Sequence, residues 1–190
     1  DQRDDAEGEV GVDRVGGLDR RVDLVEEGFD LSIRITARIG PSDVVRKLGT
    51  CRMVTVAAPG YLARHGRPSQ PSDLAGHECL AYAGDANPGA WAFGRGDRVE
   101  TVYVRSRFNA NNGDVLAEAA AHGIGITLAP DFIAEPYLRD GRLESILGEF
   151  SPPDLGVYAI LPGTRHLPYR VRALIEFISA RLRSATPAHA

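Results

Sequence analysis

Hydrophobic and polar positions alternate most clearly in a short segment near residue 30. The apolar residues of the segment 29–35 are separated by Asp30, Ser32 and Arg34. A period of two is typical of a strand that buries one face and exposes the other. The pattern therefore predicts a strand over residues 29–35 whose apolar side chains face a core.

Helical spacing appears in four other segments. An amphipathic pattern over residues 18–25 ends at Gly28, and an alanine-rich run over residues 115–122 follows a cluster of polar side chains that commonly cap helices. Residues 171–182 carry the strongest helical pattern of the chain. Residues 131–139 begin as a helix that we expect Pro136 to interrupt, since proline cannot donate a backbone hydrogen bond.

Short apolar runs between loop residues predict the remaining strands. These strands cover residues 44–48, 53–58, 79–82, 91–93, 99–107, 124–128, 143–147 and 157–161, and the fourth and fifth of them form a hairpin around residues 94–97. Strands that alternate with helices indicate an α/β protein.

Charge divides the chain into two unlike parts. Residues 1–17 hold six acidic residues and two arginines, which leaves 20 acidic and 20 basic residues from totals of 26 and 22. The net charge of −4 therefore belongs to this glycine-containing segment, which has no hydrophobic period and which we expect to be disordered. The neutral remainder lacks the basic surface of a nucleic-acid-binding protein and favours a small partner.

Several classes of protein are excluded by composition. No apolar stretch approaches the roughly 18 residues of a membrane helix, and the acidic N-terminus lacks the pattern of a signal peptide. We therefore expect a cytoplasmic protein with no membrane partner. Two cysteines, Cys51 and Cys79, are too few for a disulfide framework and too far apart for a local metal site.

Catalytic motifs are missing as well. The chain has neither a Gly-x-Ser-x-Gly elbow nor a phosphate-binding loop, and Gly123 and Gly125 lack the third glycine of a dinucleotide fingerprint. The histidines show no metal-ligand spacing. We predict no enzymatic activity, no cofactor and no metal.

Five segments, taken in order and with their spacing, resemble the effector-binding (substrate-binding) domain of LysR-type transcriptional regulators. They are residues 22–34, 46–62, 73–80, 111–130 and 165–168. The resemblance covers residues 18–183 and implies an α/β fold of two lobes, similar to type 2 periplasmic binding proteins, with two crossover strands and a cleft for a small molecule. It assigns residues 18–53 and 162–183 to the first lobe and residues 54–161 to the second, and leaves residues 184–190 as a loose tail.

The chain departs from the family pattern in two ways. The N-terminal helix-turn-helix of these regulators has no counterpart, so we expect contact with DNA only through a domain absent from this chain. The first strand and first helix of the first lobe, expected before Leu18, also have no counterpart in residues 1–17. The first lobe is therefore predicted to be incomplete, and a homo-oligomer is expected only if that lobe forms.

The resemblance also suggests which residues line the cleft, since ligands of open α/β sheets bind at loops that follow strands. Arg34, Ile35 and Thr36 end the first clear strand and would lie at the mouth of the cleft. The guanidinium of Arg34 suits an anionic effector. A surface ion pair explains this arginine equally well.

A second group of candidates lies at the start of the predicted helix over residues 115–122. The helix opening at Asn111 to Asp114, which includes Asn112 and Gly113, has free backbone N–H groups and a positive dipole end that suit a carboxylate. Helix capping explains the two asparagines equally well. Asn109 would project toward the cleft, opposite an apolar wall that contains Leu128 and Pro130. Pro130 also has a simpler explanation, which is that it ends a strand.

These features together predict a non-catalytic domain that senses a small effector. The effector would be an anionic or aromatic metabolite, bound between the lobes, that controls the oligomer of a DNA-bound regulator. Two alternatives stay open at this stage: a stand-alone solute-binding protein of the same fold, and a non-functional remnant of a truncated regulator.

Overall fold

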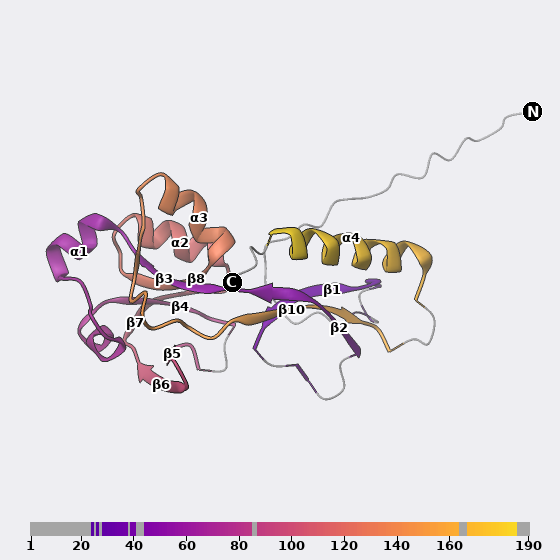
Figure 1. The fold of residues 1–190 in the computed structure, drawn as a ribbon, viewed down its shortest axis with the longest axis horizontal. Helices are drawn as coiled ribbons and strands as arrows, with labels where there is room; N and C mark the ends of the chain where they lie inside the picture. Colours follow the sequence, from indigo (N-terminus) through magenta and orange to yellow (C-terminus); the bar gives the residue numbers. More distant parts are fainter. Residues whose placement is uncertain are drawn as a thin grey trace, which may run out of the picture.

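The computed structural model describes residues 24, 26, 28–37, 39–40, 44–84, 87–163 and 167–185, and it describes side-chain burial only as far as residue 182. These residues form a three-stranded and a five-stranded β-sheet that lie end to end, with helices packed on their faces, and a separate two-stranded hairpin (Figure 1). The predicted α/β class is confirmed. The predicted helix over residues 18–25 and the predicted disordered segment 1–17 lie outside the described residues, apart from residue 24.

The smaller sheet has three antiparallel strands in the order β1-β10-β2. Their bounds are β1 Ser32–Thr36, β2 Val44–Cys51 and β10 Leu155–Leu161. The helix α4, Tyr169–Ala185, packs Val171 and Ile175 on one face of this sheet against Val157 and Ala159 of β10. Because α4 reaches Ala185, residues 184 and 185 of the predicted tail belong to the helix, and residues 186–190 lie outside the described part of the chain.

The larger sheet has five strands in the order β7-β4-β8-β3-β9. Their bounds are β3 Met53–Ala57, β4 Cys79–Tyr82, β7 Ser106–Ala110, β8 Ile126–Pro130 and β9 Glu144–Ile146. Strand β4 is parallel to β7 and β8, whereas β3 is antiparallel to β8 and β9.

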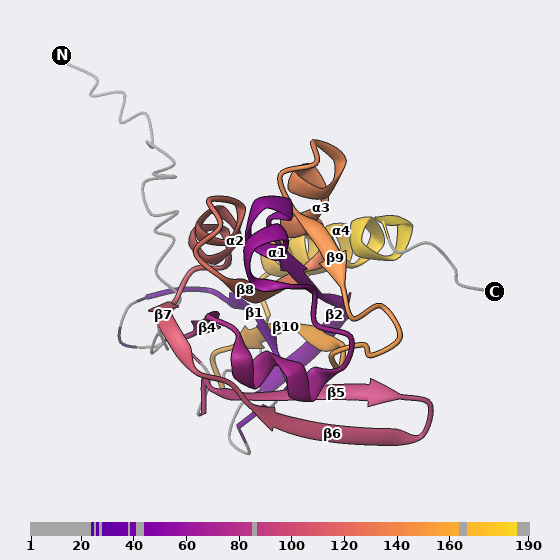
Figure 2. The ribbon, with the colours of Figure 1, turned by 90° about the vertical axis from the view of Figure 1, so that its left-hand side faces the viewer.

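Both faces of the larger sheet are covered. Helices α2, Gly113–Ala121, and α3, Asp131–Arg139, cover the face that carries Val56, Leu80 and Ala129. The other face packs against α1, Pro59–His65, the 3-10 helix Pro71–Gly76 and a hairpin of β5, Ala90–Arg95, and β6, Arg98–Tyr103. Figure 2 shows this hairpin on the side of the sheet opposite α2 and α3. The larger sheet is thus the middle layer of three.

The chain passes between the two sheets twice. Strand β2 continues into β3 with only Arg52 between them, and the segment after β9 returns to the smaller sheet as β10. The predicted lobe boundaries placed residues 155–161 in the second lobe, with residues 54–57 and 157–161 as the two crossover strands. The pairing of β10 with β1 and β2 assigns it instead to the smaller sheet, because its backbone hydrogen bonds are made there.

The strand predicted at residues 29–35 is present as β1, but the prediction that its apolar side chains are buried is wrong. Ile33 and Ile35 are 46% and 38% exposed. They share a face with their cross-strand partners Ala159 and Val157, which α4 covers. The alternation was correct, and the exposure arises because α4 lies over β10 and β2 and leaves β1 open.

Two other predictions of secondary structure need correction. Residues 99–107 do not form one strand, because β6 ends at Tyr103 and β7 then joins a different sheet. Pro136 does not interrupt α3, which continues to Arg139. A proline at this position leaves the carbonyl of Phe132 without a helical partner. Both residues are exposed, so water can hydrate that carbonyl.

Candidate functional site

The strand registers bring the predicted site residues at the ends of β1 and β8 to the junction of the two sheets. Since β4 is parallel to β7 and β8, the carboxyl ends of these three strands lie at one edge of the larger sheet. At that edge Pro130 is paired with Met53, immediately after the Arg52 link. In the smaller sheet Thr36 is paired with Gly156, next to the pair of Leu155 with Cys51. The ends of β1 and β8 therefore border the same junction.

Arg34, Ile35 and Thr36 lie at the end of β1, but they do not share a face. Arg34 is half-buried opposite Tyr158 and Thr36 is half-buried opposite Gly156, on the face away from α4. Ile35 points to the face that carries α4 and is exposed there. One ligand on a single face of β1 would thus contact Arg34 and Thr36 but not the side chain of Ile35.

Asn112 is the N-cap of α2. Its side-chain oxygen accepts hydrogen bonds from the backbone N–H groups of Asp114 and Val115, at 2.9 and 3.1 Å. Both donors belong to the first turn of the helix whose free N–H groups were expected to suit a carboxylate. The carboxyl group of Asp114 also lies in the first turn. The N-terminus of α2 therefore has fewer donors, and less positive charge, available for an anion.

The neighbouring candidates have local roles in packing and hydrogen bonding. The side-chain oxygen of Asn109 accepts a hydrogen bond of 2.6 Å from the hydroxyl of Ser106. A Cβ atom at Gly113 would lie 2.9 Å from the Cδ1 atom of Ile133, so α2 and α3 approach closely at this glycine. Asn111 is half-buried in the turn between β7 and α2.

Leu128 and Pro130 form a half-buried apolar strip at the end of β8. The two residues lie on one face of the strand, and Ala129 is buried on the other, in the cluster beneath α2 and α3. Leu128 packs against the opposite cluster. The predicted apolar wall is thus present as two residues on one face.

Thr55 is a polar residue of this region that the sequence analysis did not single out. It is the cross-strand partner of Leu128, and its side chain is buried with no hydrogen-bond partner for its hydroxyl among the described residues. Burying a hydroxyl without a partner is unfavourable. A single threonine within the apolar strand Met53–Ala57 is the signal that would have identified it.

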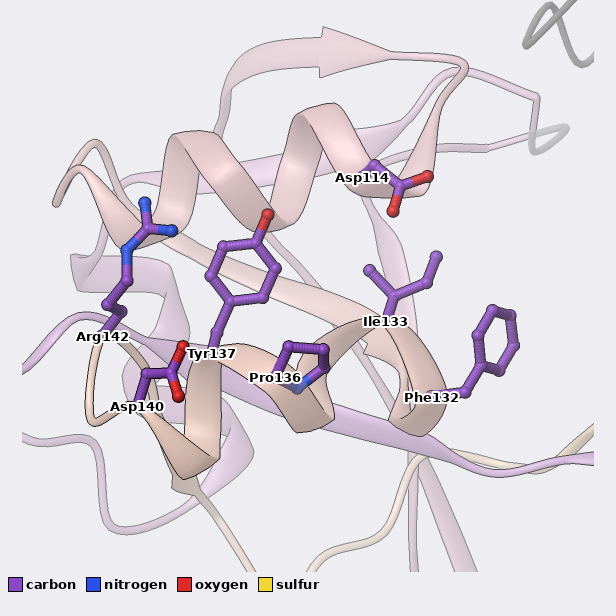
Figure 3. Close-up of a pocket in the computed structure, with 7 residues that line it drawn as sticks. All are labelled: Asp114, Phe132, Ile133, Pro136, Tyr137, Asp140 and Arg142. Carbon is purple, nitrogen blue, oxygen red and sulfur yellow. The ribbon is translucent and has the colours of Figure 1, made fainter. Parts of the chain in front are cut away.

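The pocket between α2 and α3 contains none of the predicted site residues (Figure 3). Its volume is about 440 Å³. At one end the Tyr137 hydroxyl donates a 2.8 Å hydrogen bond to the carboxylate of Glu118, and Arg142 donates to the same carboxylate while its guanidinium lies 4.9 Å from the Tyr137 ring. The hydrogen bonds from Arg142 and Tyr137 lower the pKa of Glu118. These polar groups join the two helices and provide hydrogen-bond partners for one another.

Other kinds of site find little support in the described part of the chain. The described residues contain no cluster of three or more side chains suited to hold a metal ion. Both cysteines are buried. Burial raises the pKa of Cys51 to about 11 and that of Cys79 to about 12, which disfavours the nucleophilic thiolate form. Among the described helices, none is both long enough and apolar enough to span a membrane.

Comparison with known proteins places this geometry in a family. The family model for the LysR substrate binding domain matches residues 14–183. The chain is 34% identical over 156 residues to an uncharacterized HTH-type transcriptional regulator of Haemophilus influenzae, a match that covers 82% of this chain and 54% of that protein. It is 35% identical over 164 residues to the HTH-type transcriptional regulator PtxR of Pseudomonas aeruginosa, with 86% and 53% covered. The chain spans about half the length of the curated relatives it matches.

Solved structures agree with this assignment. The regulatory domain of CrgA from Neisseria meningitidis superposes with a TM-score of 0.71 at 26% identity, and the match covers 83% of this chain and 78% of that domain. Full-length AphB from Vibrio cholerae gives a TM-score of 0.70 at 28% identity, with 85% and 55% covered. Fold and sequence thus converge on one family. The chain belongs to the LysR substrate-binding domain family, the effector-binding domain of LysR-type transcriptional regulators.

Proposed function

We propose that this domain senses a small anionic or aromatic metabolite, which binds at the junction of the two sheets and controls the oligomer of a DNA-bound, cytoplasmic regulator. The observation that supports this proposal is the strand register. It brings the end of β1, the end of β8 and the chain link at Arg52 to one border. A ligand there would contact both sheets and so favour one of their relative arrangements.

The proposed site offers two polar anchors beside an apolar strip. Arg34 supplies a positive charge for a carboxylate. The second anchor is the hydroxyl of Thr55, the cross-strand partner of Leu128. The apolar faces of Leu128 and Pro130 suit a hydrocarbon or an aromatic ring. Because Asn112 already caps α2, we assign the role of anion recognition to Arg34 rather than to the N-terminus of that helix.

Thermal-shift screening of the purified chain against aliphatic and aromatic organic acids, with matched uncharged amides, tests this function. We expect at least one acid to raise the unfolding temperature in a concentration-dependent way, since a ligand that binds only the folded state stabilises it. Calorimetry would then give the affinity. A protein that unfolds cooperatively and yet responds to no acid or ring compound would contradict the proposal.

A further inference from the structure

Strand β6 is the open edge of the β5–β6 hairpin. Figure 2 shows β6 farther from the larger sheet than β5. The edge of β5 is covered at Gly94, whose N–H donates a 2.7 Å hydrogen bond to the carbonyl of Ser151 and whose carbonyl accepts one of 2.9 Å from the N–H of Ser151. Among the described residues, no strand other than β5 pairs with β6.

The register of the hairpin shows which backbone groups point to the open edge. Opposite residues of an antiparallel pair alternate between hydrogen-bonded pairs and pairs whose N–H and C=O groups point outward. Gly94 and Val99 form a pair of the second kind, since Gly94 bonds outward to Ser151. Every second residue of β6 has the same orientation as Val99. The backbone N–H and C=O groups of Val99, Thr101 and Tyr103 therefore lie at the open edge.

The side chains of the same three residues form an exposed face of the hairpin. Val99 and Tyr103 are 68% and 73% exposed, and Thr101 between them is exposed as well. Val102, on the opposite face, packs against the core cluster that contains Trp91. β-branched and aromatic residues favour strands, whereas edge strands that must stay unpaired commonly carry charges or prolines. On its exposed face β6 carries neither.

We propose that β6 pairs with β6 of a second copy of the chain, antiparallel and about a twofold axis at Thr101. This register gives each outward-facing residue a partner, with Thr101 opposite Thr101 and Val99 opposite Tyr103 on both sides of the axis. Pairs of threonines, and pairs of an aromatic with a β-branched residue, are among those that stabilise sheets. Sliding one copy by two residues places Glu100 opposite Glu100 or leaves Val99 beyond the end of the partner strand.

The charges at the two ends of β6 favour the same partner. Asp97, in the turn before β6, and Arg105, after its end, are both exposed and have opposite charges. The neighbouring Arg98 points to the other face of the strand, and Arg95 is paired with Glu149. An antiparallel second copy brings the Asp97 end of one strand to the Arg105 end of the other, at both ends of the pair, so unlike charges attract. This complementarity arises between two identical strands, which favours a second copy over an unrelated protein.

The proposed contact is small and independent of the smaller sheet. A ladder of two short strands buries little area, so we expect a weak, reversible dimer. The hairpin packs on the larger sheet, and the contact therefore requires neither the smaller sheet nor an effector. It goes beyond the proposed binding of a small molecule.

Sedimentation velocity of the 190-residue chain over a range of concentrations tests the inference. We expect a reversible equilibrium of monomer and dimer. Thr101→Lys and Thr101→Glu each place like charges opposite one another at the axis, so each variant alone should dimerise at least about tenfold more weakly than the parent. An equimolar mixture of the two should dimerise again, because the charges at the axis then differ in sign. The matched control is Ser145→Lys, which adds a charge to the exposed edge strand β9 and should leave the dimer unchanged.

Three results would overturn the inference. One is a parent chain that circular dichroism shows to be folded and that stays monomeric at about 1 mM, where even a very weak contact would be visible. Another is a dimer that Thr101→Lys leaves intact. The third is a mixture of the two folded variants that does not associate, which would exclude a twofold axis at Thr101. No effector enters these experiments, so the test is separate from that of the proposed function.

Discussion

Arg52 and Asp131 are joined by two contacts at the point where the chain passes from the smaller sheet to the larger one. The backbone N–H of Asp131 donates a 2.9 Å hydrogen bond to the carbonyl of Arg52, and the Arg52 Nε atom lies 3.4 Å from the Asp131 carboxylate. The same carboxylate accepts a 2.8 Å hydrogen bond from the N–H of Phe132. The link between the sheets is thereby attached to the first turn of α3.

The ion pair of Arg52 and Asp131 should add little to stability, because both side chains are substantially exposed. We expect Asp131→Asn to lower the free energy of unfolding by about 0.2–1 kcal/mol. Asp131→Ala should cost somewhat more, since it also removes the acceptor for Phe132. Urea denaturation of both variants measures this difference. Equal losses for the two substitutions would show that the hydrogen bond to Phe132 contributes nothing.

Asn112 should behave as a helix cap whether or not an effector is present. Asn112→Ala is expected to cost about 1 kcal/mol of unfolding free energy, because it leaves two N–H groups of α2 without their acceptor. Asn112→Asp should retain most of the stability. Asn111→Ala is the matched control and should change stability by less than about 0.5 kcal/mol. A larger effect at Asn111 than at Asn112 in urea melts would contradict the assignment.

Thr55→Val separates a structural role from a ligand-binding role. The substitution keeps the shape of the side chain and removes a buried hydroxyl that has no partner among the described residues. We expect the ligand-free protein to be unchanged or more stable by up to about 1 kcal/mol. If the hydroxyl binds the effector, calorimetry should at the same time show weaker affinity for it. Clear destabilisation without ligand would show that the hydroxyl has a structural partner.

The side chain of Arg34 should increase the binding affinity for anions but not for neutral ligands. For an acid found by screening, Arg34→Gln is expected to weaken binding by about 1.5–3 kcal/mol, the range of a hydrogen bond to a charged group. The affinity for the matched amide should change much less. Calorimetric titrations of parent and variant with both compounds measure the two effects. Unchanged affinity for the acid would show that Arg34 does not bind the acid.

The two thiols should react slowly in the folded protein. Burial raises the pKa of Cys51 to about 11 and that of Cys79 to about 12, so both are neutral thiols at pH 8. A folded-state pKa above the unfolded value stabilises the fold below pH 9. That contribution is lost as the pH rises from about 9 toward 11–12, because the unfolded thiols ionise first. Labelling with a thiol reagent should be fast in urea and slow without it, and fast labelling of the folded chain would contradict this expectation.

The fold was largely predictable from sequence because its signals are local. The alternation at residues 29–35 and the helical spacing at 171–182 each correspond to an element of the structure. Burial was less predictable, because it depends on which helix covers which strand. The exposure of Ile33 and Ile35 follows from the position of α4, and a period of two contains no information about that position.

The candidate site was predictable to a lesser degree. Resemblance selected residues at the ends of β1 and β8, and the register brings those ends to one junction. The choice between capping and ligand binding at Asn112 required the positions of the N–H groups of α2. The sequence shows Thr55 as a single threonine in an apolar strand, but only the positions of its neighbours show that its hydroxyl has no hydrogen-bond partner among the described residues.

The two passages of the chain between the sheets also determine an order of folding. Strand β10 is the central strand of the smaller sheet, and it follows the whole of the larger sheet in the chain. Neither β1 nor β2 can find its hydrogen-bonding partner during synthesis until the larger sheet has left the ribosome. Pairing across so long a loop is slow compared with the local contacts of the β5–β6 hairpin. The larger sheet should therefore fold first, and the smaller sheet should assemble against it afterwards.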